Sequence, residues 1–180
     1  MKSRVRLLTT LALAIVALDL ATKILVVATL DETTPPADQP RILGGLVYFS
    51  LLRNPGAAFS MATGMTWILA LIAIGVVIYI IRIAPKLKST WWAVCLGLVL
   101  GGAIGNLIDR IFRSPGFLQG HVVDFVSVFG PNAEYFPVFN VADSAITVGG
   151  ILLVFTALVL GIDLDGTKSR DTKKIKDADV

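Results

Sequence analysis

The sequence contains a single cysteine and a single histidine, so chemistry that relies on those side chains is largely excluded. Cys95 has no second cysteine with which to form an intrachain disulfide, and it cannot build a thiolate cluster for a metal. His121 is the only imidazole, which argues against a zinc site. Ser60 and Ser144 have no histidine nearby in the sequence that would activate them as nucleophiles. We therefore expect neither a thiolate metal cluster nor a zinc site.

Charged residues are also scarce. Only 16% of the 180 residues are charged, whereas 55% are hydrophobic and the mean hydropathy is +0.78. A soluble domain of this length leaves much of its surface exposed and cannot bury so many apolar side chains, so lipid is the expected solvent. The net charge of +3 does not indicate nucleic acid as a partner, because the basic residues lie at the edges of apolar runs and not in an aromatic-rich patch.

Four apolar stretches approach the length of about 20 residues that a helix needs to cross a bilayer. They run from about residues 7–30, 67–84, 91–108 and 139–162. The first resembles a signal peptide because Lys2, Arg4 and Arg6 precede it, but it is long for one and contains Asp19 and Lys23. We predict an all-α membrane protein with four transmembrane helices.

The distribution of Lys and Arg predicts the orientation. Most of the 16 basic residues lie in the N-terminal segment, in the turn after the second span, or in the tail, which four spans place on one side. The positive-inside rule then puts both termini in the cytoplasm and the two longer loops outside. Residues 1–166 are expected to form one transmembrane domain, and residues 167–180 a disordered, basic cytoplasmic tail.

The first outer loop predicts a small β-region over about residues 41–62. Leu46–Leu52 is rich in β-branched and aromatic residues, Asn54-Pro55-Gly56 is a turn signal, and Ala57–Met61 is a candidate return strand. The second outer loop, Ser114–Pro137, contains a short apolar piece at Val122–Phe129.

Several polar residues lie where lipid is expected, and such residues usually face a partner or a cavity. Asp19 and Lys23 are four residues apart and share a helix face, so they form either a structural ion pair or the support of a site. Gly97, Gly101 and Gly105 repeat every four residues, which indicates a smooth face for close helix packing.

The third span ends in a polar group. Asn106 in apolar surroundings needs a hydrogen-bond partner, which favours a role in a site. Asp109 is sufficiently explained as a charged outer cap that pairs with Arg110 or with a basic residue elsewhere.

Asp124 and Asp143 are the candidate catalytic residues. Each alone has a structural explanation, since an aspartate often forms a salt bridge or, like Asn140 or Asp143 near the start of a helix, a cap. The predicted topology nevertheless places both near the outer surface. Two carboxyls in a dry pocket share one proton, so one can accept a proton from water while the other donates one.

Two other functions remain open on these residues alone. Intramembrane acids also act as proton relays in transporters, but no internal repeat is visible and the polar groups cluster at one face. In a non-enzymatic scaffold, the acids would merely pair with Lys23, Arg53 and Arg110.

Five motifs in order resemble one known family, and together they span nearly the whole chain except the tail. They are DLATK (Asp19–Lys23), RNPGAAFS (Arg53–Ser60), GGAIGNLIDR (Gly101–Arg110), VVDF (Val122–Phe125) and FNVADSAI (Phe139–Ile146). On these motifs the chain resembles the lipoprotein signal peptidases, the type II signal peptidases of bacteria.

The resemblance implies four transmembrane helices, a small periplasmic β-cradle and a short extramembrane helix over the active site. It implies an aspartic endopeptidase of the inner membrane that acts without a cofactor. Its substrates would be diacylglyceryl-modified prolipoproteins, cut on the N-terminal side of the lipidated cysteine, and its other contact would be membrane lipid. We expect a monomer.

The motif positions imply a role for each matching residue. Asp124 and Asp143 match the catalytic dyad, and Asp19 and Lys23 match a pair that supports the pocket. The positions that line the site and hold the substrate backbone are matched by Asn54, Gly56, Asn106, Arg110 and Asn140. Leu20 departs from the family pattern, where a glutamine is common, and this puts in doubt only one hydrogen bond on the first helix.

Overall fold

The computed structural model describes residues 2–56 and 66–168. Four of its helices are long and apolar enough to cross a membrane, as predicted. Their bounds are α1 (Lys2–Thr29), α2 (Thr66–Ile83), α3 (Thr90–Phe112) and α4 (Val141–Val154), which a π-helical turn, η5 (Phe155–Val159), continues. The fold class is therefore confirmed.

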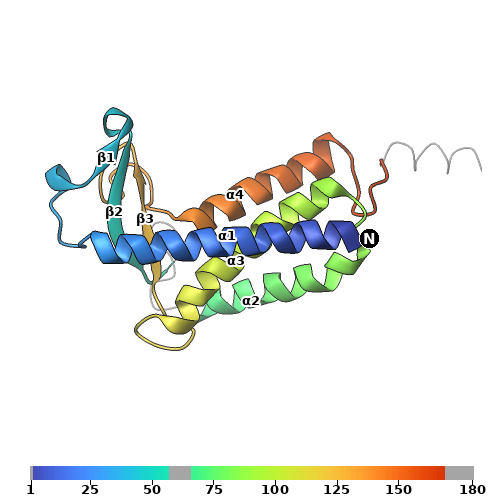
Figure 1. The fold of residues 1–180 in the computed structure, drawn as a ribbon, viewed down its shortest axis with the longest axis horizontal. Helices are drawn as coiled ribbons and strands as arrows, with labels where there is room; N and C mark the ends of the chain where they lie inside the picture. Colours follow the sequence, from blue (N-terminus) through green and yellow to red (C-terminus); the bar gives the residue numbers. More distant parts are fainter. Residues whose placement is uncertain (1, 57–65, 169–180) are drawn as a thin grey trace, which may run out of the picture.

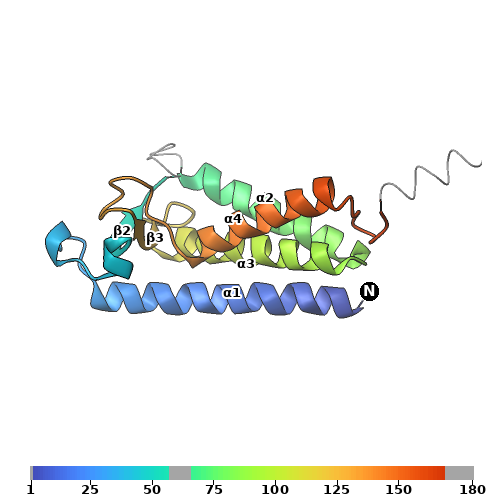
Figure 2. The ribbon, with the colours of Figure 1, turned by 90° about the horizontal axis from the view of Figure 1, so that it is seen from above.

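The helices form an elongated bundle with α3 at its centre, since α3 contacts each of the other three. Figure 1 shows the bundle lengthwise, with the N-terminus at one end and the strands at the other. Figure 2, turned by 90°, shows α1 along one side of the bundle and α2 on the opposite side. The start of α1 and the last described residues of the chain lie at the same end.

A small antiparallel sheet lies at the other end of the bundle. It contains β1 (Arg41–Ile42), β2 (Val47–Asn54) and β3 (Val122–Val128), in the order β1-β2-β3. The predicted strand in the first outer loop corresponds to β2. Its partner β3 comes from the second outer loop, where only a short apolar piece was recognised.

Two expectations fall partly outside the described residues. The candidate return strand Ala57–Met61 lies in the undescribed range 57–65, and most of the predicted disordered tail lies in 169–180. Among residues 2–56 and 66–168, the only helices in the outer region are the 3₁₀ turns Pro36–Asp38 and Leu43–Gly45, so the expected extramembrane helix is not found there.

The glycine stripe of α3 packs against α1, as the spacing predicted. A Cβ added at Gly101 would lie 2.7 Å from the Cβ of Ile15, and one at Gly105 would lie 2.7 Å from Oδ2 of Asp19. The absence of side chains therefore lets the two helices approach closely. This close approach brings the polar residues of α1 beside those at the outer end of α3.

Gly102 performs the same role between α3 and α4, and it gives a testable prediction. A Cβ at Gly102 would lie 2.4 Å from the carbonyl oxygen of Ala142, which is helix backbone and cannot rotate away. We expect Gly102→Ala to destabilise the protein by about 1–3 kcal/mol or more, because α4 must move outward. Thermal unfolding in detergent would measure this. Gly75→Ala is the matched control, since nothing lies within 4 Å of a Cβ on Gly75 in α2, and an equal loss in both variants would contradict the packing argument.

Candidate active site

Asp124 lies in the middle of β3 and is 2% exposed. Its Oδ2 accepts a hydrogen bond of 2.8 Å from Asn54 Nδ2, and its Oδ1 accepts one of 2.7 Å from Asn140 Nδ2. Asn54 ends β2 opposite Val122, two residues along from Asp124, so their side chains share one face of the sheet. The amide of Asn54 is held in turn, because its Oδ1 accepts from the backbone N–H of Gly56 at 2.9 Å. The predicted turn thus orients a donor toward Asp124.

Asp143 lies in the first turn of α4, where it forms a capping box with Asn140. The N–H of Asp143 donates to Asn140 Oδ1 at 2.8 Å, and the N–H of Asn140 donates to Asp143 Oδ2 at 3.2 Å. The other carboxyl oxygen of Asp143 accepts from Asn106 Nδ2 at 2.7 Å. Asp143 therefore has the predicted capping role and also faces a polar group on α3.

Asn140 joins the two aspartates. Its side chain is fully buried, its Oδ1 binds the first turn of α4, and its Nδ2 donates to Asp124. Asn140 thus positions the carboxyl of Asp124 on β3 and also the first turn of α4, which carries Asp143. The structure brings together the two aspartates that the sequence placed only at a common depth.

The pKa of Asp124 is raised to about 7. Burial is the largest cause, because it penalises the charged form, and the negative charge of Asp143 adds to it. The hydrogen bonds from Asn54 and Asn140 oppose the rise because they favour the carboxylate. This side chain therefore holds a proton at a pH where an exposed aspartate would not.

A buried ion network lies behind the two aspartates. Lys23 Nζ is 2.8 Å from Asp19 Oδ2, 2.8 Å from Asp109 Oδ2, and donates to Asn106 Oδ1 at 3.1 Å. Lys23 and Asp19 have no exposed surface, and Asp109 is 1% exposed. The predicted pair on the first helix is confirmed, and it is extended by a second carboxylate from α3.

This network holds the elements that carry the aspartates. Asp19 Oδ1 accepts from the N–H of Ala142 at 2.9 Å, which fixes the first turn of α4. Asp109 Oδ2 accepts from the N–H of Val123 at 3.1 Å, which fixes β3 beside Asp124. Because Lys23 also donates to Asn106 Oδ1, the amide nitrogen of Asn106 is turned toward Asp143.

Asp109 has a larger structural role than the charged outer cap that the sequence predicts. It pairs with Lys23 and Arg113, and not with Arg110 as one expectation had it. A signal was available, because Asp109 continues the four-residue spacing of the glycine stripe by one more step. That spacing places it on the face of α3 that packs against α1.

Arg110 is buried in the last turn of α3. Its Nη2 donates to the carbonyl oxygen of Gly56 at 3.0 Å. Its Nη1 is buried and has no hydrogen-bond partner within residues 2–56 and 66–168. A guanidinium N–H of this kind is available to a carbonyl oxygen of a bound molecule. In the same described ranges, no group of three or more His, Cys, Asp or Glu side chains is arranged to hold a metal ion.

Comparison with known proteins shows the family. Residues 11–159 match a family model described as signal peptidase (SPase) II, which is most of the chain. The chain belongs to the signal peptidase II family. The matched range contains both aspartates and every other predicted site residue.

The family resemblance is strong in related sequences. The chain is 56% identical over 162 residues to the lipoprotein signal peptidase of Rhodococcus jostii, covering 90% of this chain and 77% of that one. It is 52% identical over 162 residues to the lipoprotein signal peptidase of Mycobacterium avium, covering 90% and 84%.

Solved structures show the same fold. One, described as a bacterial membrane enzyme at 2.3 Å resolution, aligns with a TM-score of 0.67 and 30% identity, covering 84% of this chain and 87% of that one. A second, at 1.9 Å resolution, aligns with a TM-score of 0.64 and 31% identity, covering 83% and 90%. The chain is thus a multi-pass membrane protease of the signal peptidase II family.

Proposed function

We propose that Asp124 and Asp143 are the catalytic pair with which this protease removes signal peptides from diacylglyceryl-modified prolipoproteins. The observation that carries the proposal is the bridge through Asn140, which binds Asp124 with its amide nitrogen and Asp143 with its amide oxygen. The family of this chain supports the function of a peptidase. The motif resemblance implies cleavage on the N-terminal side of the lipidated cysteine. Residues 1–166 make up the catalytic domain.

The two carboxyls divide the chemistry of peptide hydrolysis between them. The ionised one takes a proton from water as the water oxygen attacks the carbonyl carbon of the peptide bond. The protonated one donates its proton to the carbonyl oxygen and recovers it when the carbonyl re-forms, while the other carboxyl passes the proton it took from water to the leaving nitrogen as the C–N bond breaks. The products are a new carboxyl on the signal peptide and a new amine on the lipidated cysteine, so no metal is needed to balance the reaction.

Seven further residues help to position the substrate and the pair. Asn54 and Asn140 hold Asp124, while Asn106 holds Asp143. Arg110 anchors the turn at Gly56, and its Nη1, which has no hydrogen-bond partner among the described residues, binds a substrate carbonyl oxygen. Asp19 and Lys23 support this group from α1 without touching the substrate.

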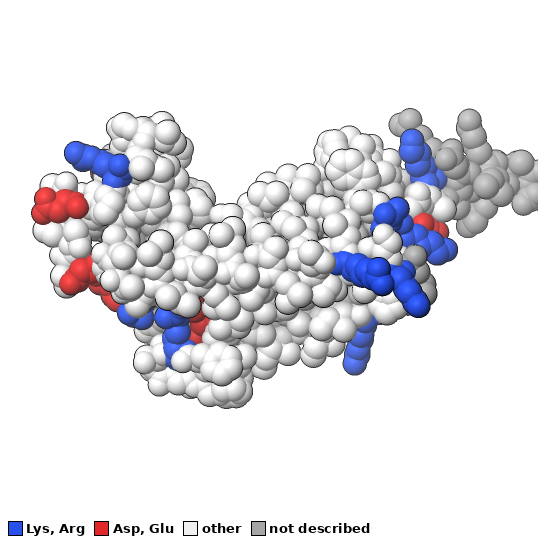
Figure 3. Space-filling view, viewed as in Figure 1, with Lys and Arg blue, Asp and Glu red and all other residues white. Residues whose placement is uncertain are grey.

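The orientation follows from charge. Lys and Arg gather at the end of the bundle where α1 begins, and both signs of charge lie at the sheet end (Figure 3). Under the positive-inside rule the N-terminus and the tail face the cytoplasm, and the aspartates lie near the periplasmic side of the inner membrane. A substrate whose cysteine carries a lipid is anchored at that depth. The enzyme acts as a monomer in contact with membrane lipid.

The test is cleavage of a purified prolipoprotein precursor with and without its diacylglyceryl group. We expect the purified protein to cut the lipidated precursor immediately before the cysteine, and mass spectrometry of the products would identify the bond. Equal cleavage of both precursors would contradict the proposed substrate class. Absence of cleavage in the lipidated precursor would contradict the proposed function.

The raised pKa of Asp124 predicts how the rate depends on pH. The pair needs one shared proton, so the cleavage rate should fall as the pH rises through about 7, where Asp124 loses its proton. Asn54→Ala removes a hydrogen bond that favours the carboxylate, so the pKa of Asp124 rises and this alkaline limb moves to higher pH. Rates measured from pH 5 to 10 and normalised to their maximum would show it.

Glu32→Gln is the control for the pH prediction, because it changes an exposed charge that pairs with Arg53 at the sheet end. Its alkaline limb should coincide with that of the wild type. If the alkaline limb of Asn54→Ala moved to lower pH or did not move, the role assigned to the hydrogen bond between Asn54 and Asp124 would be contradicted.

A further inference from the structure

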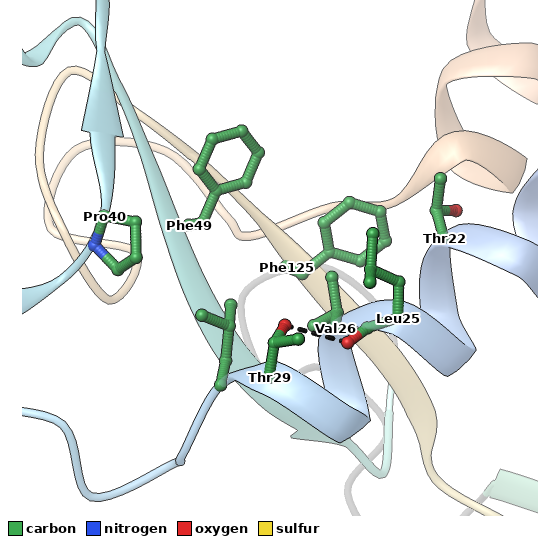
Figure 4. Close-up of a pocket in the computed structure, with 8 residues that line it drawn as sticks. Thr22, Leu25, Val26, Thr29, Pro40, Phe49 and Phe125 are labelled. Carbon is green, nitrogen blue, oxygen red and sulfur yellow. Dashed lines mark hydrogen bonds between the residues drawn. The ribbon is translucent and has the colours of Figure 1, made fainter.

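An apolar pocket of about 450 Å³ lies between the end of α1 and the sheet (Figure 4). Four of its lining residues come from α1, and the others come from the segment after it and from the sheet region. They are Thr22, Leu25, Val26, Thr29, Leu30, Pro40, Phe49 and Phe125. None of these residues belongs to the proposed catalytic group.

The two threonines of the pocket do not make it polar. Thr22 Oγ1 donates to the carbonyl oxygens of Leu18 and Asp19 at 2.8 and 3.0 Å, and Thr29 Oγ1 donates to that of Leu25 at 2.8 Å. Because both hydroxyls are bonded to the backbone of α1, each threonine is left to present its methyl group. The pocket therefore suits a hydrocarbon and offers little to a polar ligand.

The pocket is continuous with the surface that faces lipid. Its helical wall is the last part of a membrane-spanning helix, and α1 is apolar and exposed there, with Ile24 65% and Leu25 61% exposed. On the face shown in Figure 3, the surface of the bundle between its two charged ends carries no Lys, Arg, Asp or Glu. An acyl chain of the surrounding bilayer can thus reach the pocket without crossing a polar layer.

At β3, the pocket is lined by Phe125, the residue that follows Asp124 in the strand. Successive side chains of a strand point to opposite sides. Phe125 packs with Val26 of α1 in a hydrophobic cluster, while Asp124 faces Asn54 and Asn140. The side chain of Phe125 therefore points away from that of Asp124, against which the cleavage site of a substrate must lie.

We propose that the pocket binds one acyl chain of a bilayer phospholipid, which packs against Phe125 and so supports β3 beside Asp124. An apolar cavity of about 150 Å³ is enough to bind benzene, so a volume three times larger accommodates a substantial length of chain. The choice of a bilayer lipid over the substrate's own lipid rests on the proposed catalytic role of Asp124. The proposal that an acyl chain is bound in the pocket does not depend on that role.

Photolabelling tests the proposal independently of cleavage. The protein would be reconstituted in phosphatidylglycerol vesicles that contain a lipid with a diazirine in the middle of one acyl chain. We expect labels on residues 22–30 and on Phe49 or Phe125. Leu25→Trp fills the pocket and should remove the labels on Phe49 and Phe125. Ile24→Trp, at an equally exposed neighbour that does not line the pocket, should keep them.

Two results would overturn the proposal. The first is labelling confined to the outer surface of α1, with none on Phe49 or Phe125 in the wild type. The second is loss of the pocket labels when a lipidated prolipoprotein, but not the same precursor without lipid, is added to the Asp124→Asn variant, since the pocket would then belong to the substrate. Retention of the labels in that experiment supports a bilayer lipid.

Discussion

Asp124→Asn and Asp143→Asn are each expected to reduce the rate of prolipoprotein cleavage by about 10³-fold or more, because each removes one of two proton-transfer groups. An asparagine has nearly the shape of an aspartate but cannot exchange a proton with water or substrate. All four buried partners of these carboxyls are N–H donors, so each asparagine keeps one accepted hydrogen bond and loses the other, and the fold of both variants has to be measured beside the rate.

The rate would be measured on a diacylglyceryl-modified precursor at pH 6 to 7, with thermal unfolding in detergent to verify the fold. Asp38→Asn is the matched control, because Asp38 is an exposed aspartate in the first outer loop. The control should cleave at the wild-type rate. Wild-type turnover in either dyad variant would remove that residue from the mechanism.

Lys23→Met is expected to cause the largest loss of stability, about 3–5 kcal/mol, because it leaves the buried carboxylate of Asp19 without a cation and leaves Asp109 only with the partly exposed Arg113. Asp19 and Asp109 both lie 2.8 Å from Lys23 Nζ, and all three side chains are almost completely buried. The same contacts fix β3 and the start of α4. We therefore expect cleavage to be lost together with stability.

The control is an ion pair of the same type at the surface. Arg53 pairs with Glu32, and their side chains are 40% and 44% exposed. Arg53→Met should cost about 1 kcal/mol or less, since water replaces the partner. Thermal unfolding of both variants in detergent would compare them. In addition, the double variant Lys23→Met/Asp19→Asn should be more stable than Lys23→Met alone. If it were not, the argument from buried charge would be contradicted.

The four helices were predictable from sequence because crossing a bilayer requires a long apolar run, which is a local property. The predicted second span, residues 67–84, differs by one residue at each end from α2, Thr66–Ile83. The sheet was only half predictable. β2 has a local strand pattern, but its partner β3 lies in the other outer loop, and pairing between distant segments is determined by tertiary structure.

The residues proposed for the site could be named from the sequence, but the network of contacts between them could not. Asp124 and Asp143 were recognised by their common depth and motif context, whereas the link through Asn140 needed coordinates. Asn140 had been considered both as a cap and as a site residue, and it has the contacts of both. Asp109 was explained locally as a cap, because the glycine stripe was interpreted only as a packing face and not followed one step further to Lys23.

The most direct test of the account is the cleavage rate of the double variant Asp124→Asn/Asp143→Asn beside the two single variants. If the two carboxyls share one proton and act as a unit, removing either one disables the pair. The double variant should then be about as slow as each single variant, as expected for residues that work together. A loss in the double variant equal to the product of the two single losses would show that the aspartates act independently and would contradict the proposed pair.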